Sequence, residues 1–574
     1  MNVTLARYRD PGSGELAVSF PYDEVVRSIV KDVPGRRYIG STHLWVIPDN
    51  PDSVMKLKTD LAARGHGLLM TPDVRDSLNK SYNAAKVAHA VRAAGDAPDI
   101  EWPLAVQPYA HQRAGLAFLR SLGGGALLWE MGLGKTLGAI AFCESLMTTP
   151  LPHGSGAMPI RVLVIAPNTV KRNWGREIDM ATGGSPWVIP EGEYRKRITQ
   201  LGTRRYTIIN TEALSYPVMA KALQAIEWDV VIVDESTRFK GPKSLRTKAL
   251  LKLRAKHRVI LTGTPITNTA EDAWAPFEFV SPGLFGKSYF AFMDRYLIRD
   301  WFGAVTGIKP DRAQELRDRI DSRSYRILKA DVLDLPEKVY VDRVVTMPPD
   351  SEQHHAYASM RDELRAAYEN GEIEAFNVLT QTLRLTQITA GFVGEQGKWM
   401  RFKNHAKQTE MDAIMDEIGD EPVVVFGIYH EELEALAERY SRDYHLGALP
   451  IIYGPTPEKA RAHYIDEFQA GRIGRLFVQS RTGGIGINLT AARTAVYHTR
   501  SWSLEEYLQS QDRLHRIGQT GTVTIVHLIA EGTVDEQIAK ALRTKRNLAD
   551  DLTGDLARSL AREAMGMTKG DNHD

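Results

Sequence analysis

The 574-residue chain contains a single cysteine, Cys143. One cysteine cannot form an internal disulfide, and it excludes zinc sites that use several cysteine ligands, so we expect a reducing compartment. No apolar run is long enough to span a bilayer, and the opening stretch, MNVTLARYRD, lacks the apolar core of a signal peptide. These absences predict a soluble, cytoplasmic protein without a membrane partner.

The chain also has almost no net charge and no internal repeats. The 72 Lys and Arg residues nearly balance the 71 Asp and Glu residues, so the formal net charge is +1. Such a balance gives no global basic field, and any nucleic acid must be held by local patches. No period of about 20 to 50 residues repeats, which argues against a solenoid. The length predicts about three to five domains in an ordinary globular protein.

The N-terminal region, residues 1–98, is predicted to be a small α+β domain followed by a linker. Alternating apolar residues indicate strands, and amphipathic spacing indicates helices, the second of them ended by Gly65. The expected strands lie within residues 15–20, 36–40 and 43–49, and the expected helices span residues 23–33 and 52–65.

Two series of short apolar runs, separated by helical stretches, make up most of the remaining chain. Continuous apolar runs bounded by polar or turn residues are typical of parallel strands buried on both faces. The first series lies at residues 125–130, 161–167, 206–210, 228–235 and 258–265, and the second at 422–429, 449–454, 475–480, 494–499 and 523–529. The alternation predicts an α/β fold with two tandem parallel sheets.

Four domain boundaries follow from this pattern. We expect the first sheet and its helices over residues 99–285 and the second over residues 411–540. Between them, residues 286–410 are predicted to form a helical insertion and inter-lobe linker, and residues 541–574 a C-terminal helix and tail.

The stretch WEMGLGKT, from Trp129 to Thr136, combines the end of a predicted strand with glycines and the start of a helix. Backbone N–H groups at a helix start attract phosphate, so this order predicts a phosphate-binding loop. Lys135 would reach the β- and γ-phosphates, and Thr136 would hold Mg²⁺. The residues assigned to the loop are Met131, Gly132, Leu133, Gly134, Lys135 and Thr136. Taken alone, the stretch could also be a glycine-rich turn, since Trp129 stands where the usual pattern has its first glycine.

A carboxylate pair, Asp234 and Glu235, ends the predicted strand WDVVIVDE. Hydrolysis of ATP with Mg²⁺ needs such a pair, so Asp234 would bind the metal and Glu235 would orient or deprotonate the attacking water. The alternative is an exposed acidic cap at the end of a strand.

The stretch QSQDRLHRIGQ in the second series contains two arginines. Gln509, Arg513 and Arg516 stand at positions i, i+4 and i+7, which would place them on one face of a helix. Two arginines on one stripe suit the charge that develops on a γ-phosphate during its transfer. A solvated, charged helix is the alternative.

The motifs and their order resemble the Swi/Snf-type branch of superfamily-two helicases. The resemblance covers roughly residues 100–545 and rests on PYAHQRAGLAFL, EMGLGKT, VIAPNTVKRNW, INTEALS, VIVDES, LTGTPITN, RILKADVLDLPEK, QSRTGGIGINLTAA and QDRLHRIGQ. It implies two RecA-like lobes, the cofactors ATP and Mg²⁺, and an ATPase that moves on double-stranded DNA. In this branch the position of Trp129 is not a required glycine, so we expect Trp129 to pack at the strand end.

The same resemblance assigns further residues. Gln112 would read the adenine, and Gly486 and Gln509 stand at positions that approach the nucleotide. The positions along the DNA are Trp174, Thr211, Thr262, Gly263, Ser480, Asn488 and Trp502. Hydroxyls, amides and backbone N–H groups contact phosphates without reading sequence. Each of these residues, taken singly, could instead belong to a core or a turn. Thr237 departs from the family because it replaces a histidine that helps to couple hydrolysis to DNA.

The N-terminal region also resembles the HARP module of annealing helicases, in a stretch with Tyr38 and Trp45 around a predicted hairpin. Arg36 and Arg37 would contact phosphates, and an exposed aromatic ring would stack on a base at a junction. The alternative is a small domain whose core contains Trp45. The resemblance implies action on forked or branched DNA in replication, recombination or repair.

Three classes of function therefore stay open at the level of sequence. The leading expectation is a translocase on double-stranded or branched DNA, a monomer that works beside replication or recombination proteins in a bacterial or viral setting. The second is a motor that displaces a DNA-bound protein such as RNA polymerase. The third is a strand-separating helicase.

Overall fold

The computed structural model describes residues 2–8, 15–33, 36–49, 51–147, 160–263, 269–286, 288–301, 305–369, 375–395, 398–441, 449–484 and 487–552. It divides into two compact units, the first built mainly from Met1–Leu328 and the second mainly from Lys329–Leu548. No helix in the described ranges is both long and apolar enough to cross a membrane.

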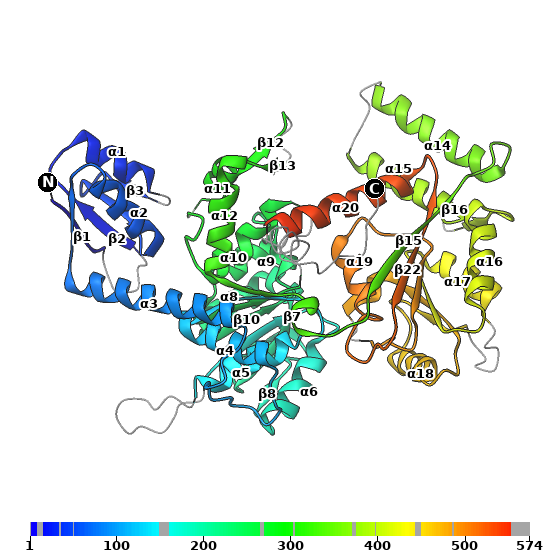
Figure 1. Cartoon of the computed structure of the whole chain (residues 1–574), viewed down its shortest axis with the longest axis horizontal. Helices are drawn as coiled ribbons and strands as arrows, with labels where there is room; N and C mark the ends of the chain where they lie inside the picture. Colours follow the sequence, from blue (N-terminus) through cyan, green and yellow to red (C-terminus); the bar gives the residue numbers. More distant parts are fainter. Residues whose placement is uncertain are drawn as a thin grey trace. The chain divides into compact units, whose positions relative to one another are not determined.

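The N-terminal domain of the first unit is a five-stranded sheet covered by two helices (blue in Figure 1). Its strand order is β3-β4-β2-β1-β5, and β1 pairs parallel with β5. Its elements are β1 Asn2–Arg7, β2 Glu15–Ser19, α1 Glu24–Asp32, β3 Arg37–Ile39, β4 Leu44–Pro48, α2 Pro51–Ala62 and β5 Gly67–Met70. The three predicted strands and two predicted helices are confirmed, whereas β1 and β5 were not predicted.

The core of this domain follows from the alternation of its strands. Val3 and Leu5 of β1 and Leu16 and Val18 of β2 are buried together with apolar residues of α1 and α2. Helix α1 begins where the side chain of Asp23 accepts a hydrogen bond from the N–H of Val26, a standard N-cap.

A seven-stranded parallel sheet forms the centre of the first RecA-like lobe, in the order β14-β6-β11-β10-β7-β9-β8. Helix α3 (Pro72–Ala94) precedes it. The remaining helices are α4 Ala110–Leu122, α5 Lys135–Ser145, α6 Lys171–Thr182, α7 Tyr194–Thr199, α8 Pro217–Ala225, α9 Leu245–Leu250, α10 Trp274–Val280, α11 Tyr289–Tyr296 and α12 Pro310–Ser322. The strands are β6 Gly124–Trp129, β7 Val162–Ala166, β8 Trp187–Val188, β9 Tyr206–Asn210, β10 Glu227–Asp234, β11 Arg254–Leu261 and β14 Ser324–Ile327, with a separate hairpin of β12 Leu297–Arg299 and β13 Val305–Ile308.

A six-stranded parallel sheet forms the second RecA-like lobe, in the order β15-β22-β21-β18-β20-β19. Its strands are β15 Lys338–Val345, β18 Val423–Gly427, β19 Ile451–Ile452, β20 Arg475–Gln479, β21 Thr494–Tyr497 and β22 Val523–Ala530, with a separate hairpin of β16 Phe392–Glu395 and β17 Lys398–Arg401. The helices are α13 Lys329–Val332, α14 Glu352–Glu369, α15 Ala375–Thr389, α16 Ala406–Ile418, α17 His430–Tyr440, α18 Glu458–Gln469, α19 Leu504–Gln511 and α20 Val534–Leu552.

The interval 286–410 is not one insertion between the sheets. Strand β14 completes the edge of the first sheet, and β15 forms the edge of the second. The first sheet therefore extends beyond the expected boundary at residue 285, and the second begins well before residue 411. Both edge strands contain Tyr, Arg or Asp among their apolar residues, so they lack the continuous apolar runs that marked the central strands.

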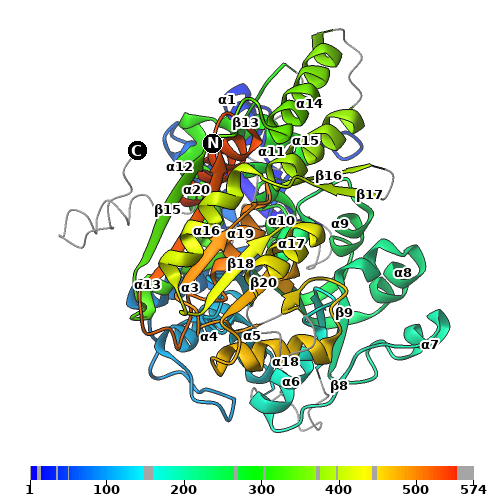
Figure 2. The ribbon, with the colours of Figure 1, turned by 90° about the vertical axis from the view of Figure 1, so that its right-hand side faces the viewer.

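Helices cover both faces of the second sheet (Figure 2). Along β18, Val423 and Val425 pack with residues of α16 and α17, whereas Val424 and Phe426 pack with residues of α18, α19 and α20. Successive side chains of a strand point to opposite faces, so a strand buried on both sides must be apolar throughout. This explains why the VVVF segment of β18 has no polar residues alternating with its apolar ones.

Trp129 ends β6 and is fully buried, as expected of a packing residue. Its ring meets the rings of His111 and Tyr325 edge-on, at centroid distances of 5.3 and 6.1 Å. Gly115 of α4 lies against the same ring, because a Cβ at that position would stand only 2.3 Å from Cζ2 of Trp129. The absence of a side chain at Gly115 thus lets α4 approach the strand that leads into the glycine-rich loop.

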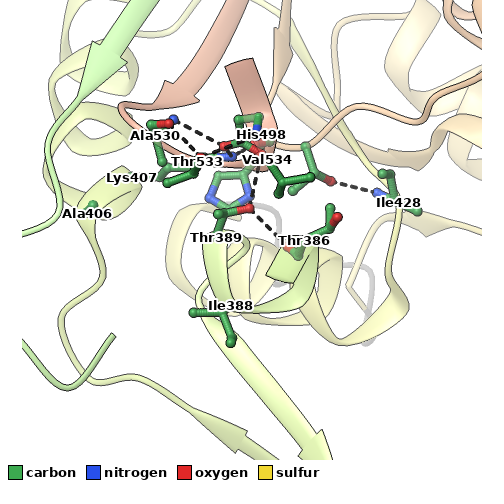
Figure 3. A network of polar contacts seen from close by, with 12 residues as sticks. Thr386, Ile388, Thr389, Ala406, Lys407, Ile428, His498, Ala530, Thr533 and Val534 are labelled. Atoms are coloured by element: carbon green, nitrogen blue, oxygen red, sulfur yellow. Dashed lines mark hydrogen bonds and ion pairs between the residues drawn. The ribbon is translucent and has the colours of Figure 1, made fainter. Parts of the chain in front are cut away.

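A buried polar network ties the helices of the second unit together (Figure 3). Lys407 of α16 has no exposed surface, and its Nζ lies 2.7 Å from Oδ2 of Asp535 and donates to the carbonyl of His498 at 2.6 Å. The other oxygen of Asp535 accepts a hydrogen bond from Thr389 at 3.0 Å. The ring of His498 contacts the buried carboxylate of Glu432 at 2.6 Å. One network thus joins α15, α16, α17 and α20 at the end of β21.

We expect Gly115→Ala to destabilise the first unit, because the new methyl group overlaps Trp129. Overpacking costs about 1–3 kcal/mol, offset in part by the higher helix propensity of alanine. The midpoint of urea denaturation should fall, and Trp129→Leu in the same chain should restore part of the loss. Gly241→Ala is the control, since its nearest neighbour would be 3.9 Å away. An unchanged midpoint for Gly115→Ala would contradict the close approach.

We expect Lys407→Met to destabilise the second unit by about 3–5 kcal/mol, because the mutation leaves the buried carboxylate of Asp535 without its cation. Adding Asp535→Asn should recover part of this loss, since the uncompensated charge is then gone. Thermal and urea denaturation of the two variants measure the effect. The exposed Lys459→Met serves as the control. Equal stabilities of Lys407→Met and wild type would show that the pair contributes nothing.

Candidate nucleotide and nucleic-acid site

The structure confirms the predicted order of strand, loop and helix around the glycine-rich stretch. Strand β6 ends at Trp129, and α5 begins at Lys135. Gly132 and Gly134 have φ angles of 84° and 75°, a left-handed conformation that favours glycine. A Cβ at Gly134 would also lie 2.2 Å from Nε2 of Gln112, so any other residue there would have to displace that amide as well as adopt a strained backbone.

Two side chains of helix α4 contact the backbone of this loop. The ring of His111 contacts the carbonyl of Leu133 at 2.9 Å, and the amide of Gln112 donates to the same carbonyl at 3.4 Å. Oε1 of Gln112 accepts a hydrogen bond from the N–H of Tyr109 at 3.0 Å. Gln112 is therefore fixed between the start of α4 and the loop, at the place where the sequence predicted a nucleotide contact.

Lys135 begins the helix that follows β6, and Asp234 ends β10, so both lie at the carboxyl edge of the first sheet, with β11 between their strands. Nζ of Lys135 donates to the carbonyl of Trp129 at 2.8 Å and to that of Glu130 at 3.3 Å. Burial raises the pKa of Asp234, while a hydrogen bond from Trp174 and the positive charge of Lys135 oppose that rise. The structure thus brings the predicted lysine and the predicted metal-binding carboxylate into one electrostatic environment.

Glu235 has a strained backbone. Its φ angle is 48°, which is left-handed and unfavourable for a residue with a side chain by about 1–3 kcal/mol. The N–H of Glu235 donates to Oδ1 of Asp234 at 3.0 Å, and this contact holds the turn between β10 and a short 3-10 helix, Ser236–Phe239. Such strain collects at functional sites, and here it falls on the residue that the sequence assigned to the attacking water.

Trp174 was predicted to approach DNA, and the structure corrects this. Its side chain is 1% exposed, and its indole N–H donates to Oδ2 of Asp234 at 2.9 Å. The side chains of Thr211 and Thr262 are fully buried too, so neither presents its hydroxyl to a partner at the surface. The physical reason is the apolar face of α6, which turns Trp174 towards the sheet. Gly263 lies against the loop, since a Cβ there would be 3.4 Å from the carbonyl oxygen of Trp129.

Glu177 is a functional candidate that the sequence reasoning missed. It follows Trp174 by three residues on α6, a spacing that places both side chains on one face. Burial and the negative charge of Asp234 raise the pKa of Glu177 to about 7, while hydrogen bonds from Asn173 and Thr136 oppose the rise. The pair of Trp174 and Glu177 at helical spacing was the available signal.

The arginines of the second unit do not lie on one helix face, contrary to the prediction. Helix α19 ends at Gln511 and contains only Gln509 of the three residues. The N–H groups of Leu514 and His515 both turn back to the carbonyl of Gln511, so the chain leaves the helix as a tight turn. Arg513 and Arg516 therefore belong to a loop, residues 512–518, which we call the arginine loop.

Arg513 is a buried cation. Its side chain is 4% exposed, and neither Nη1 nor Nη2 has a hydrogen-bond partner among the described residues. Burial lowers the pKa of Arg513 to about 10, which still leaves it charged at neutral pH. Arg516 is half-buried and donates weakly to the carbonyl of Ile487 at 3.5 Å. A buried guanidinium without an acceptor is costly, and an anion that supplies acceptors would remove that cost.

Two further predicted residues of the second unit also carry unsatisfied polar atoms. Oγ of Ser480 and Oδ1 of Asn488 are buried without partners among the described residues. Gly486, assigned to nucleotide, lies outside the described residues. Trp502 is 38% exposed, so its ring is available at the surface as a DNA contact requires.

In the N-terminal hairpin, the exposed aromatic residue is Tyr38 rather than Trp45. Trp45 is half-buried and packs against the domain core, whereas Tyr38 is 49% exposed, with the two ring centroids 5.0 Å apart. Arg36 is exposed, and Arg37 forms an ion pair with Glu15 at 2.7 Å. Trp45 therefore packs against the core without being enclosed in it, and its assignment to DNA stays a prediction.

Magnesium would find oxygen ligands in the first unit. The carboxylate of Asp234 and the hydroxyl of Thr136 are the hard oxygen donors that Mg²⁺ prefers, and the ion usually takes few protein ligands together with substrate phosphates. No group of three or more His, Cys, Asp or Glu side chains in the described ranges is arranged to hold a metal by itself. The residues therefore fit a metal that arrives with a nucleotide.

Comparison with known proteins adds family descriptions to this geometry. The SNF2-related domain matches residues 111–391, and the helicase conserved C-terminal domain matches residues 406–518. These matches contain the glycine-rich loop, the Asp234–Glu235 pair and the arginine loop. Residues 1–98 lie outside both matches, so the resemblance to a HARP module stays a proposal.

The matches to individual relatives cover only part of each relative's length. The chromatin-remodeling complex ATPase ISW1 of Saccharomyces cerevisiae is 26% identical over 456 residues, which are 74% of this chain and 38% of that protein. The human DNA excision repair protein ERCC-6 is 26% identical over 492 residues, 77% of this chain and 32% of that protein. This chain thus spans about a third of the length of these two relatives.

Among solved structures, the SWI2/SNF2 ATPase core of Sulfolobus solfataricus in complex with double-stranded DNA is 25% identical, with a TM-score of 0.40, and covers 79% of this chain and 94% of that one. The two family matches occur in sequence order and together contain the motifs of both parallel sheets. The chain therefore belongs to the Swi/Snf-type family of helicase-like ATPases.

Proposed function

We propose that the protein is a DNA-dependent ATPase that couples ATP hydrolysis to movement along double-stranded DNA. The supporting observation is the buried guanidinium of Arg513, which has no acceptor for its terminal nitrogens among the described residues. A γ-phosphate would provide those acceptors and would be stabilised by the charge.

In this proposal the first unit holds the nucleotide. The N–H groups at the start of α5 and Nζ of Lys135 would bind the phosphates, and Lys135 would exchange its carbonyl contacts for phosphate oxygens. Asp234 and Thr136 would hold Mg²⁺, and Trp174 would keep Oδ2 of Asp234 in place through its indole N–H. When bound, ATP with Mg²⁺ supplies the phosphoanhydride bond whose hydrolysis releases the energy for movement.

Glu235 would orient or deprotonate the attacking water, and its strained backbone would hold the carboxylate for that task. Arg513 and Arg516 would act on the same phosphate when the two lobes close, so hydrolysis would depend on closure. Gripping and releasing DNA as the lobes close and open would convert hydrolysis into translocation.

On the DNA side, Ser480 and Asn488 carry buried polar atoms that a phosphate or a water molecule would satisfy. Trp502 presents a partly exposed ring. We further propose that the N-terminal domain directs the motor to forked or branched DNA, in replication, recombination or repair, because Tyr38 and Arg36 place an exposed ring and an exposed cation on one hairpin.

We expect ATP hydrolysis to rise with double-stranded DNA, and Lys135→Ala and Arg513→Ala each to lower kcat by at least about 100-fold. Arg513→Ala should still bind ATP, because the phosphates are held in the other unit. Assays with single-stranded, duplex and forked DNA measure these effects, and Arg472→Ala, an exposed arginine, is the control. Hydrolysis indifferent to every DNA would contradict the proposal, and unwinding of a plain tailed duplex would indicate a strand-separating helicase instead.

We expect Tyr38→Ala combined with Arg36→Ala to abolish a preference for forked over plain duplex DNA while duplex-stimulated hydrolysis stays within twofold. The reason is that a stacking ring contributes about 1–3 kcal/mol per base, and an arginine adds a salt-dependent phosphate contact. Competition binding with forked and linear DNA measures the preference. Tyr82→Ala, which removes an exposed ring on α3, is the matched control. A fork preference that survives in the double variant would overturn this role.

A further inference from the structure

The arginine loop is held by the chain segment that opens the second unit. This segment, residues 329–342, which we call the linker segment, comprises α13 and the first half of β15. Its residues contact the arginine loop and the helix before it through side chains and carbonyl groups. The contacts are local to the second unit, because the unit begins at Lys329.

Lys329 makes the central contact. Its side chain is only 5% exposed, and Nζ lies 2.7 Å from Oδ1 of Asp512 and 2.7 Å from the carbonyl oxygen of His515. These two acceptors stand on either side of Arg513 in the chain. One ammonium group therefore fixes both ends of the turn that carries the arginine. A pair with so little exposure is screened weakly by solvent, so its geometry is well defined.

Two other contacts repeat the pattern. The ring of His515 contacts the carbonyl oxygen of Pro336 at 2.7 Å, and the hydroxyl of Tyr340 donates to Oε1 of Gln511 at 3.0 Å. The linker segment thus contacts the loop at Asp512 and His515, and the last residue of α19 at Gln511, on both sides of Arg513.

Two consecutive side-chain contacts connect strand β15 of the same segment to α19. Asp342 contacts Nδ1 of His527 at 2.7 Å, and Nε2 of that ring contacts the hydroxyl of Tyr507 at 2.8 Å. Tyr507 lies on α19, which leads directly into the arginine loop. The segment therefore supports both the helix and the turn that follows it.

Arg513 itself adds little to the position of its loop. Nη1 and Nη2 of its guanidinium have no hydrogen-bond partner among the described residues, and its backbone carbonyl accepts a hydrogen bond from the N–H of Leu489 at 3.0 Å. A guanidinium whose terminal nitrogens make no hydrogen bonds depends for its position on packing and on the backbone that carries it. Here the ammonium of Lys329 holds Asp512 on one side of Arg513 and the carbonyl of His515 on the other.

We propose that Lys329 is a positioning residue for Arg513, through which the linker segment sets the place of the arginine for phosphate transfer. The proposal rests on the proposed function, since it assigns to Arg513 the γ-phosphate of ATP. Lys329 does not touch the nucleotide in this scheme. It acts through Asp512 and the carbonyl of His515, so any shift of the chain at the start of the second unit is passed to the arginine.

The first test is a mutant cycle in the full chain. Lys329→Met should lower kcat of DNA-stimulated ATP hydrolysis about 10- to 100-fold with KM changed less than twofold, and Lys329→Arg should recover most of the rate because it keeps the charge. In the Arg513→Ala background, Lys329→Met should lower the rate no further, since residues that act through one another are not additive. Lys459→Met is the control. Additive losses, or a raised KM with unchanged kcat, would overturn the proposal.

The second test does not depend on activity. Amide hydrogen exchange of residues 510–519 should accelerate at least tenfold in Lys329→Met and stay unchanged in Lys329→Arg and Lys459→Met. If no DNA stimulates hydrolysis by the wild-type protein, the proposed function fails, and the exchange data alone decide whether Lys329 holds the loop. Unchanged exchange in Lys329→Met would overturn the positioning role whatever the activity.

Discussion

Parallel pairing of strands is the constraint on which the candidate site of the first unit and the buried polar network of the second unit both depend. Leu127 of β6, Leu261 of β11 and Asp234 of β10 stand in one row of the first sheet. Because parallel strands end at the same edge, the glycine-rich loop after β6 and the carboxylate of Asp234 after β10 emerge at one edge of the sheet, on either side of β11. In the second sheet the same rule brings the turns after β18 and β21 together, where Glu432 and His498 meet in a buried contact. The chemistry at each edge is therefore an outcome of sheet topology.

The central strands and the phosphate loop could be predicted because their signals are local. An apolar run such as VVVF, or glycines before a helix, determines structure within a few residues. The predictions failed where residues far away in the sequence determine the local structure. Helix α19 ends before Arg513, at a turn whose Asp512 and His515 are both bound by Lys329, 183 and 186 residues away. Strands β1 and β5 likewise form through pairing across the N-terminal domain.

The candidate site shows the same division. Lys135, Asp234 and Glu235 were identified from motif and position, and the structure places Lys135 at the start of the helix after β6 and the two carboxylates at the end of β10, as expected. Trp174 was assigned to DNA, but its side chain is buried and its indole N–H donates a hydrogen bond to Asp234. A motif identifies which residues a site uses, whereas only packing shows whether a side chain faces a ligand or supports one that does. Glu177 belongs to the second kind, because its altered pKa comes from neighbours brought in by tertiary structure.

Part of residues 286–410 belongs to the first sheet and part to the second. This determines where the chain could be broken into two fragments that each fold. Strand β14 ends at Ile327, and Lys329 already belongs to the second unit. A break after Leu328 would leave each fragment with a complete sheet and would keep Lys329 beside the loop it holds. A break at residue 285 would remove the edge strand of the first sheet and leave the opposite fragment with an unpaired strand. Two-fragment complementation should therefore succeed at the first position and fail at the second.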